Sequence, residues 1–190
     1  MNKLLESEKV ASIEKSDAID ILDRTIDFVR NCDNKASIFL GVFGVIVTIV
    51  LTTDGVDNLT AIFNAAIAQL SFCNVLYLAM MVGAVVAAVF GLSQIIRVLG
   101  VKVDPLKEEG IENDSKIFFE SIKRNVNYIA YKAKLLSMSD EEFLNDVTSQ
   151  IYINACICSD KYKNYKCGLK WSLIGFIAFV VLWAIGTILF

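Results

Sequence analysis

The chain has 190 residues, of which 55% are hydrophobic, and it carries a net charge of −3 with no histidine. This composition is too apolar for an ordinary soluble domain of that length and predicts a membrane protein. Without histidine the chain lacks the commonest general base and metal ligand, and its five cysteines show no CxxC spacing. We therefore expect no metal site, no catalytic residues and no enzyme activity.

The basic residues are unevenly distributed along the chain. Six Lys and Arg residues lie in residues 1–35 and twelve in residues 97–170, whereas residues 36–96 contain none. Basic residues gather on the cytoplasmic side of membrane proteins. The pattern predicts a multi-pass protein of the cell inner membrane, with the N-terminus in the cytoplasm and Phe190 outside.

Residues 1–35 are predicted to form a cytoplasmic N-terminal helix. Apolar side chains recur every three or four residues, as on one helix face, at Ile19, Leu22, Ile26 and Val29. The uncharged, mostly apolar residues 36–53 follow, close to the roughly 20 that a helix needs to cross the hydrocarbon core. No helix breaker separates the two patterns, so we expect one long rod.

Asp33, Asn34 and Lys35 form a predicted membrane-interface motif at the start of this first span. The Lys35 side chain can extend its ammonium toward lipid headgroups. The motif is either an anchor with a local pair between Asp33 and Lys35, or part of a binding site. Charged residues are common at the ends of spans, which favours neither alternative decisively.

Residues 36–98 are predicted to hold two transmembrane helices with a short external connection. We expect a loop after Thr52-Thr53-Asp54-Gly55, then a helix over residues 59–72 that either lies at the outer interface or begins a longer second span. The second span proper covers the 22 uncharged residues 75–96. Small residues follow one another there at four-residue spacing, at Ala79, Gly83, Ala87 and Gly91. Such a stripe favours close helix packing, although alanine is also common in spans generally.

Residues 99–168 are predicted to form a cytoplasmic helical sensing region. Asn113 and Ser115 are expected to cap a helix whose inward side chains are Ile117, Phe118, Ile122 and Val126. A turn is expected near Ser137, and Ser139 and Glu142 have the spacing of a capping box. From there the helical pattern continues without a breaker into the third transmembrane helix, residues 169–190.

Two sets of side chains in this region are candidates for ligand binding. Phe118 and Phe119 could stack on a base, or could pack in a core. Gln150, Asn154 and Lys161 share one helix face, with Tyr162 beside them. Amides can read a base edge and a lysine can meet a phosphate, but the same groups could satisfy one another between helices. We expect the ligand site where the 115–126 helix meets residues 150–162.

Several short motifs occur in a fixed order over roughly residues 16–190. They are Ile26-Asp27-Phe28-Val29-Arg30 with Asp33-Asn34-Lys35-Ala36-Ser37, then Ile117-Phe118-Phe119-Glu120-Ser121-Ile122, then Glu142-Phe143-Leu144-Asn145-Asp146 with Gln150-Ile151-Tyr152 and Lys161-Tyr162. In this order the motifs resemble the Pycsar transmembrane effector family (PycTM). The resemblance implies an antiphage effector that senses cyclic CMP or cyclic UMP, made by a partner pyrimidine cyclase, and then impairs or permeabilises the inner membrane. It assigns no ligand-contact residues.

Together these patterns predict an all-α membrane protein, with three transmembrane helices and a helical cytoplasmic layer. We expect a homo-oligomer in contact with membrane lipid, with no cofactor and no nucleic acid partner. The alternative is a non-catalytic membrane scaffold or sensor subunit that binds a partner protein through residues 101–165. A small transporter is disfavoured because no charge lies within any predicted span.

Overall fold

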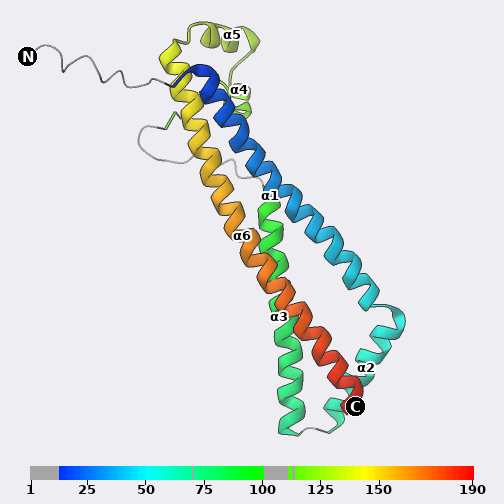
Figure 1. The fold of residues 1–190 in the computed structure, drawn as a ribbon. Helices are drawn as coiled ribbons and strands as arrows, with labels where there is room; N and C mark the ends of the chain where they lie inside the picture. The colour runs from blue at the N-terminus through cyan, green and yellow to red at the C-terminus, as the bar shows by residue number, and fades with distance from the viewer. Residues whose placement is uncertain (1–12, 70, 101–110, 113) are drawn as a thin grey trace, which may run out of the picture. The chain divides into compact units, whose positions relative to one another are not determined.

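The computed structural model describes residues 13–69, 71–100, 111–112 and 114–190, and all regular structure in these ranges is helical. The helices are α1 (Lys15–Val50), α2 (Thr53–Ala68), α3 (Phe72–Leu99), α4 (Phe119–Lys123), α5 (Tyr128–Leu136) and α6 (Asp140–Leu189) (Figure 1). By length and composition α1, α3 and α6 can each cross a membrane. The predicted fold class, an all-α membrane protein with three transmembrane helices, is confirmed.

The chain divides into two compact units. We call residues 31–101 with 159–190 the span unit, and residues 1–30 with 102–158 the polar unit. α2 and α3 belong to the span unit, α4 and α5 to the polar unit, and α1 and α6 contribute residues to both. The predicted continuity of the N-terminal helix with the first span, and of the Ser139 helix with the third, is therefore confirmed.

α6 begins at the predicted capping box. The backbone N–H of Ser139 donates to Glu142 Oε2 at 3.0 Å, and the N–H of Glu142 donates to Ser139 Oγ at 3.2 Å. This reciprocal pair satisfies two backbone donors that a helix start leaves free. The predicted turn near Ser137 is also confirmed, since α5 ends at Leu136 and α6 begins at Asp140.

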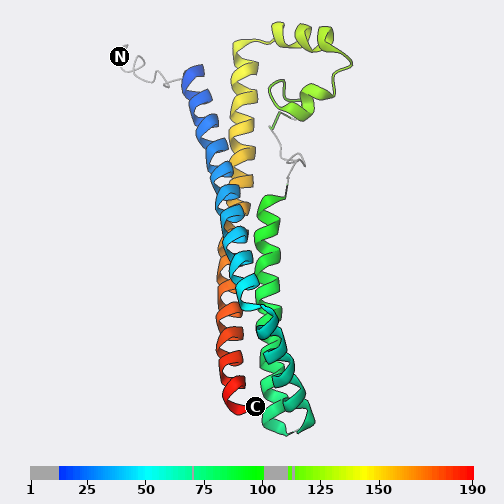
Figure 2. The ribbon, with the colours of Figure 1, turned by 90° about the vertical axis from the view of Figure 1, so that its right-hand side faces the viewer.

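In the span unit α3 and α6 meet at small residues. A Cβ atom added to Gly91 of α3 would collide with the backbone nitrogen of Ser172 of α6, and one added to Gly175 would collide with the backbone nitrogen of Ala88. The two helices cross in Figure 1 and lie next to each other in Figure 2. The backbones can approach this closely only because no side chain stands between them.

α2 differs from its prediction. The helix starts at Thr53 with Thr52 as its N-cap, so the loop expected after Gly55 is helical instead. It ends at Ala68, and α3 starts separately at Phe72, so the alternative in which this helix begins a longer second span is wrong. It packs along α3, where Ile62, Tyr77 and Met81 form a buried cluster. Trp183 Nε1 donates to Asn58 Oδ1 at 2.8 Å and joins α2 to α6. The start of α2 was missed because its first turn is polar and lacks apolar periodicity.

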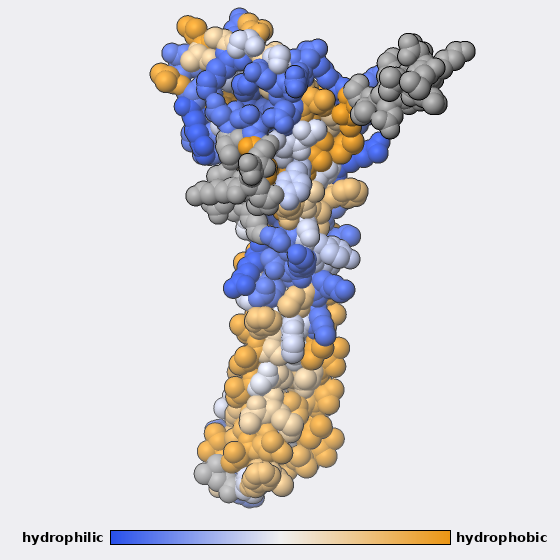
Figure 3. Space-filling view, turned by 90° about the vertical axis from the view of Figure 1, so that its left-hand side faces the viewer, coloured by the Kyte–Doolittle hydropathy of each residue, from blue (hydrophilic) through white to orange (hydrophobic). Residues whose placement is uncertain are grey.

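The surface of the span unit is largely hydrophobic, with hydrophilic residues gathered at one end of it (Figure 3). Large apolar side chains on all three span helices are more than half exposed, including Ile38, Val42, Val45, Ile49, Val82, Val86, Val89, Ile177 and Val181. An apolar surface this extensive is stable when its surroundings are hydrocarbon instead of water. The exposure pattern therefore agrees with a membrane protein.

The predicted helix over residues 115–126 is wrong in length. Only α4, five residues long, forms there, and Val126 is 93% exposed instead of inward. At its start Ser115 Oγ accepts hydrogen bonds from the N–H groups of Ile117 and Phe118, a local turn that competes with helix formation. The other expected cap, Asn113, lies outside the described residues.

Two asparagines then separate α4 from α5. The Asn125 side-chain amide donates to the carbonyl groups of Ser121 and Ile122, which ends α4. Asn127 Oδ1 accepts from the N–H of Ala130 at 2.9 Å and caps α5. Asparagine favours helix ends because its side chain forms hydrogen bonds with the nearby backbone. The two asparagines therefore end α4 and start α5 at positions that the spacing of apolar residues does not predict.

Candidate functional site

The segment before α4 is held against α6 within the polar unit. The N–H of Lys116 donates to Asp146 Oδ2 at 2.7 Å, and the N–H of Glu112 donates to Ser149 Oγ at 3.1 Å. Asp146 and Ser149 are three residues apart and share one face of α6. The segment therefore meets α6 beside Gln150, one of the predicted binding residues.

α5 contacts the same segment. The Tyr131 hydroxyl donates to the Lys116 carbonyl at 3.2 Å, and Lys134 Nζ lies 3.1 Å from Asp114 Oδ2. The ion pair is exposed and contributes little. The tyrosine bond matters more, because Lys116 is then held at its N–H by α6 and at its carbonyl by α5.

Asp146 is the chemically unusual group of this region. Its exposed fraction is 0%, and Ser115, Ser149 and Gln150 beside it in the polar unit are also buried. Oδ2 accepts from the Lys116 N–H, whereas no residue that the structure describes donates a hydrogen bond to Oδ1. Buried polar atoms are nearly always partnered, because an unmet hydrogen bond away from water raises the free energy.

Sequence reasoning did not single out Asp146. The available signal was a polar stripe in which Ser149, Gln150 and Asn154 follow Asp146 by three, four and eight residues, which places all four on one helix face. The burial of the carboxylate could not be read from that stripe. It depends on Lys116, which is 30 positions away in sequence.

Phe118 and Phe119 lie directly after the Ser115 turn. Their ring centroids are 4.7 Å apart at an interplanar angle of 54°, and Phe119 is 61% exposed. The pair therefore presents an accessible aromatic surface in the polar unit. Such a surface can stack on a planar base.

Gln150 and Asn154 differ in environment. Gln150 is buried, while Asn154 is half-buried and donates through Nδ2 to the Gln150 backbone carbonyl at 2.8 Å. One Asn154 donor is thus engaged within α6 itself. The Asn154 carbonyl oxygen remains the part of this amide best suited to a ligand donor.

Lys161 and Tyr162 belong to the span unit. Lys161 is buried, and its ammonium donates to Asp33 Oδ1 at 2.6 Å and to the Val98 carbonyl at 2.5 Å. These partners come from α1 and α3, so one side chain of α6 ties all three span helices together. Tyr162 is 58% exposed.

The membrane-interface motif is thereby divided between two environments. Asp33 is paired with Lys161 across 128 positions in sequence, instead of with its near neighbour Lys35. Asn34 and Lys35 are exposed. Val98 lies in the last turn of α3, where carbonyl groups lack helical partners and favour a cation.

The predicted small-residue stripe has two faces. Gly91 is buried against α6, whereas Gly83 and Ala79 are exposed and a Cβ atom on Gly83 would meet nothing within 4 Å. Ala87 is intermediate. Gly91 therefore serves packing within this chain, and the exposed members leave a smooth surface on α3.

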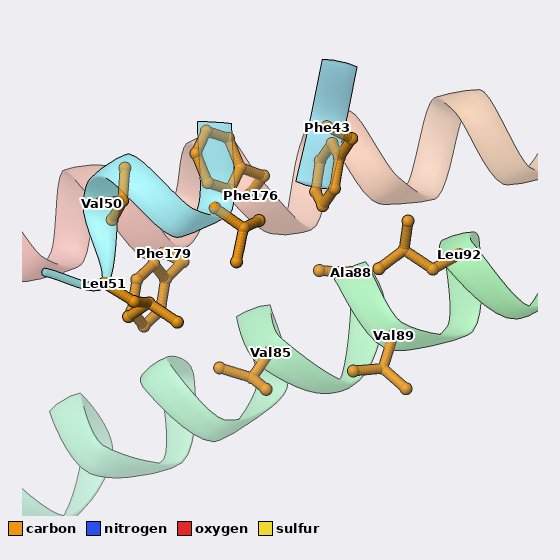
Figure 4. A pocket seen from close by; sticks show the side chains of 10 residues that line it. Phe43, Val50, Leu51, Val85, Ala88, Val89, Leu92, Phe176 and Phe179 are labelled. Carbon is orange, nitrogen blue, oxygen red and sulfur yellow. The ribbon is translucent and has the colours of Figure 1, made fainter. Parts of the chain in front are cut away.

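A cavity of about 270 Å³ lies within the span unit, between α1, α3 and α6 (Figure 4). Its lining is entirely apolar and consists of Phe43, Val47, Val50, Leu51, Val85, Ala88, Val89, Leu92, Phe176 and Phe179. A charged nucleotide would lose its hydration there without gaining a polar partner. The cavity therefore does not fit the predicted ligand.

Comparisons with known proteins agree over nearly the whole chain. The family model described as the Pycsar effector protein domain, PycTM, matches residues 17–189. The chain is 26% identical to the Pycsar effector protein GmPycTM of Gulbenkiania mobilis, over 95% of this chain and 94% of that protein. It is 25% identical to EcPycTM of Escherichia coli, over 86% and 85% of the two chains. No solved structure matches it. On the extent of the family match, the chain belongs to the PycTM family of Pycsar effector proteins.

Proposed function

We propose that this chain is an antiphage defence effector that senses a cyclic pyrimidine mononucleotide, cyclic CMP or cyclic UMP, and impairs or permeabilises the inner membrane. The defence role follows from membership of the Pycsar effector family. The nucleotide would be made by a partner pyrimidine cyclase, and the effector would act without catalysis. Ligand sensing is supported by one observation: the polar unit contains buried side chains that can form hydrogen bonds, whereas the span unit has the apolar helices of a membrane protein.

The nucleotide requires a stacking surface, polar partners for its base and a cation for its phosphate. Phe118 and Phe119 supply aromatic surface, and Gln150 and Asn154 supply amide groups. Lys161 stays the predicted cation, on the condition that a phosphate oxygen replaces the Asp33 carboxylate at its ammonium. Tyr162, exposed beside it, stays a predicted hydroxyl partner.

This exchange suggests how binding would reach the membrane. If the phosphate takes the ammonium, Asp33 of α1 and the Val98 carbonyl of α3 lose their common partner on α6. The span helices then lose a polar tie. Shifting the ratio of open to closed protein from 1:99 to 99:1 requires that the ligand bind the open form about 5.5 kcal/mol more tightly than the closed form. Several ligands on an oligomer would supply this difference more easily than one.

The proposed location is the inner membrane, with the polar unit in the cytoplasm. All 18 Lys and Arg residues lie in the segments that the positive-inside rule assigns to that side. Membrane lipid is then the direct target of the response. A homo-oligomer is proposed because three spans of one chain are few for a self-contained lesion.

A titration tests the sensing step directly. Purified full-length protein in detergent is titrated with each 3′,5′-cyclic mononucleotide by calorimetry, beside the Asn154→Ala and Lys161→Ala variants. We expect binding of cyclic CMP or cyclic UMP and weaker binding by both variants. Variants that fold and bind as the parent does would show that the predicted contacts are misplaced.

A second function, a non-catalytic scaffold or sensor subunit for a partner protein, is favoured by one observation. The polar unit exposes apolar side chains on and near α5, namely Val126, Tyr128, Ile129 and Leu136, each more than 70% exposed. An exposed apolar surface is typical of protein interaction sites. Co-expression with an active pyrimidine cyclase separates the two functions, because only the effector then becomes toxic.

A further inference from the structure

We propose that Asp146 recognises the base of the ligand, with its unpartnered carboxylate oxygen accepting a hydrogen bond from an N–H group of the pyrimidine. The inference rests on the proposed function and adds a specific contact that neither the motifs nor the family assign. It concerns only residues of the polar unit, namely Asp146, Ser149 and the described residues among 111–118. Lys161 lies 15 residues further along α6, about 22 Å away by helix rise, so a nucleotide whose base meets Asp146 has its phosphate held by a group other than Lys161.

The buried carboxylate of Asp146 is energetically costly without a ligand. A carboxylate presents about four acceptor sites. Among the described residues Asp146 accepts the Lys116 N–H at 2.7 Å, while its exposed fraction is 0%. Oδ1 is enclosed, and none of the described residues donates to it. A carboxylate needed only to hold the Lys116 N–H could be an asparagine or a serine at lower desolvation cost. Holding the Lys116 N–H therefore does not explain the second carboxylate oxygen, whereas binding a ligand donor would.

The carboxylate of Asp146 is held in one orientation. Oδ2 is fixed by the Lys116 N–H, and the Lys116 carbonyl is fixed by the Tyr131 hydroxyl at 3.2 Å. The neighbouring Ser149 hydroxyl is engaged as an acceptor for the Glu112 N–H. Because these bonds restrict rotation of the carboxylate, Oδ1 keeps a defined direction. A preoriented acceptor binds a donor without a further loss of side-chain entropy.

The acidic side chain of Asp146 limits which part of the ligand can approach it. Its negative charge repels a phosphate, so the phosphate must face away and the base must face the carboxylate. Cytosine offers its C4 amine as a donor, and uracil offers its N3–H. Hydrogen bonds to a charged acceptor are about twice as strong as neutral ones. Phe118 and Phe119, close to Lys116 in sequence, supply aromatic surface for the same base.

The test uses the full-length protein and two changes, one on each side of the bond. Asp146→Asn keeps an oxygen for the Lys116 N–H but replaces the free acceptor by an amide donor. Asn145→Ala, at the adjacent exposed position, is the matched control. On the ligand side, the cyclic nucleotide of pyrimidin-2-one carries hydrogen at C4 and has no N–H donor on its ring. This analogue is tested on the parent protein, so its result does not depend on whether Asp146→Asn folds.

We expect Asp146→Asn to weaken binding of cyclic CMP or cyclic UMP at least roughly tenfold, the usual effect of losing a charge-assisted hydrogen bond. The parent should bind the pyrimidin-2-one analogue with a loss of the same size, and Asn145→Ala should bind as the parent does. If the parent binds either nucleotide and also binds the analogue within about threefold, the inference is overturned while the proposed function stands. If the parent binds neither nucleotide, the proposed function itself fails.

Discussion

At the scale of single residues, Lys161 is the side chain with the most demanding environment. It is buried, and its ammonium holds a carboxylate of α1 and a carbonyl of α3. Burying an ammonium without partners would cost free energy. The two hydrogen bonds offset that cost and also join α6 to α1 and α3. Asp33 is about a third exposed and can regain water if the pair breaks.

We predict that Lys161→Ala lowers stability by about 1–3 kcal/mol, because Asp33 and the Val98 carbonyl lose their partner in a partly buried place. For a chain of this size that corresponds to a fall in melting temperature of roughly 2–4 °C per kcal/mol. The measurement is thermal unfolding of the purified protein in detergent.

Lys163→Ala is the matched control for this prediction. Lys163 lies in the same helix, but its side chain is 74% exposed and its nitrogen is 3.9 Å from Asp160. Exposed pairs of this kind contribute about 0–1 kcal/mol. Equal melting temperatures for the two variants would show that the Lys161 tie carries no stability.

At the scale of elements, α3 presents two kinds of small-residue surface. Gly91 is already used against Ser172 and Gly168 of α6, whereas Gly83 faces open space. A leucine would thus have opposite effects at two glycines only two helical turns apart. This difference separates packing within the chain from the proposed packing between copies.

We predict that Gly83→Leu folds and binds nucleotide like the parent but is no longer toxic, because the added side chain keeps copies of α3 apart. Gly91→Leu should instead prevent stable folding, since its Cβ atom would overlap the α6 backbone. Growth of cells that co-express a cyclase, together with the yield of folded protein, measures both effects. Full toxicity of Gly83→Leu would remove this face of α3 from the mechanism.

The elements also show which features a sequence can predict. The three spans and the two long helices were predictable, because uncharged apolar runs and the absence of breakers are properties of consecutive residues. The Ser139–Glu142 capping box was predictable for the same reason. α4 was overestimated because apolar spacing outweighed the competing side-chain bonds of Ser115 and Asn125.

The candidate site was less predictable, because its contacts join distant positions. Asp33 meets Lys161 across 128 positions, and Asp146 meets Lys116 across 30. Residue type alone suggested that Lys161 is free to bind a phosphate, while the structure gives it two protein partners. Only the folded chain reveals which polar groups are already satisfied.

At the scale of the whole molecule, the charge pattern predicts one topology in the membrane. A single cysteine is placed at Asp57 of α2 or at Lys132 of α5, both exposed, in a variant without the native cysteines. An impermeant thiol reagent added to the outside of cells with a permeable outer membrane should label the first position and not the second. Labelling at position 132 but not at 57 would reverse the topology and place the polar unit outside the cytoplasm.

We propose that a cyclic pyrimidine mononucleotide causes this protein to damage the membrane. The most direct measurement is release of a trapped dye and of ions from liposomes that carry the purified full-length protein. We predict release on addition of cyclic CMP or cyclic UMP, none with cyclic AMP at the same concentration, and little with Asp146→Asn protein. Intact liposomes at a saturating concentration of both pyrimidine nucleotides, with folded protein in the bilayer, would contradict the account.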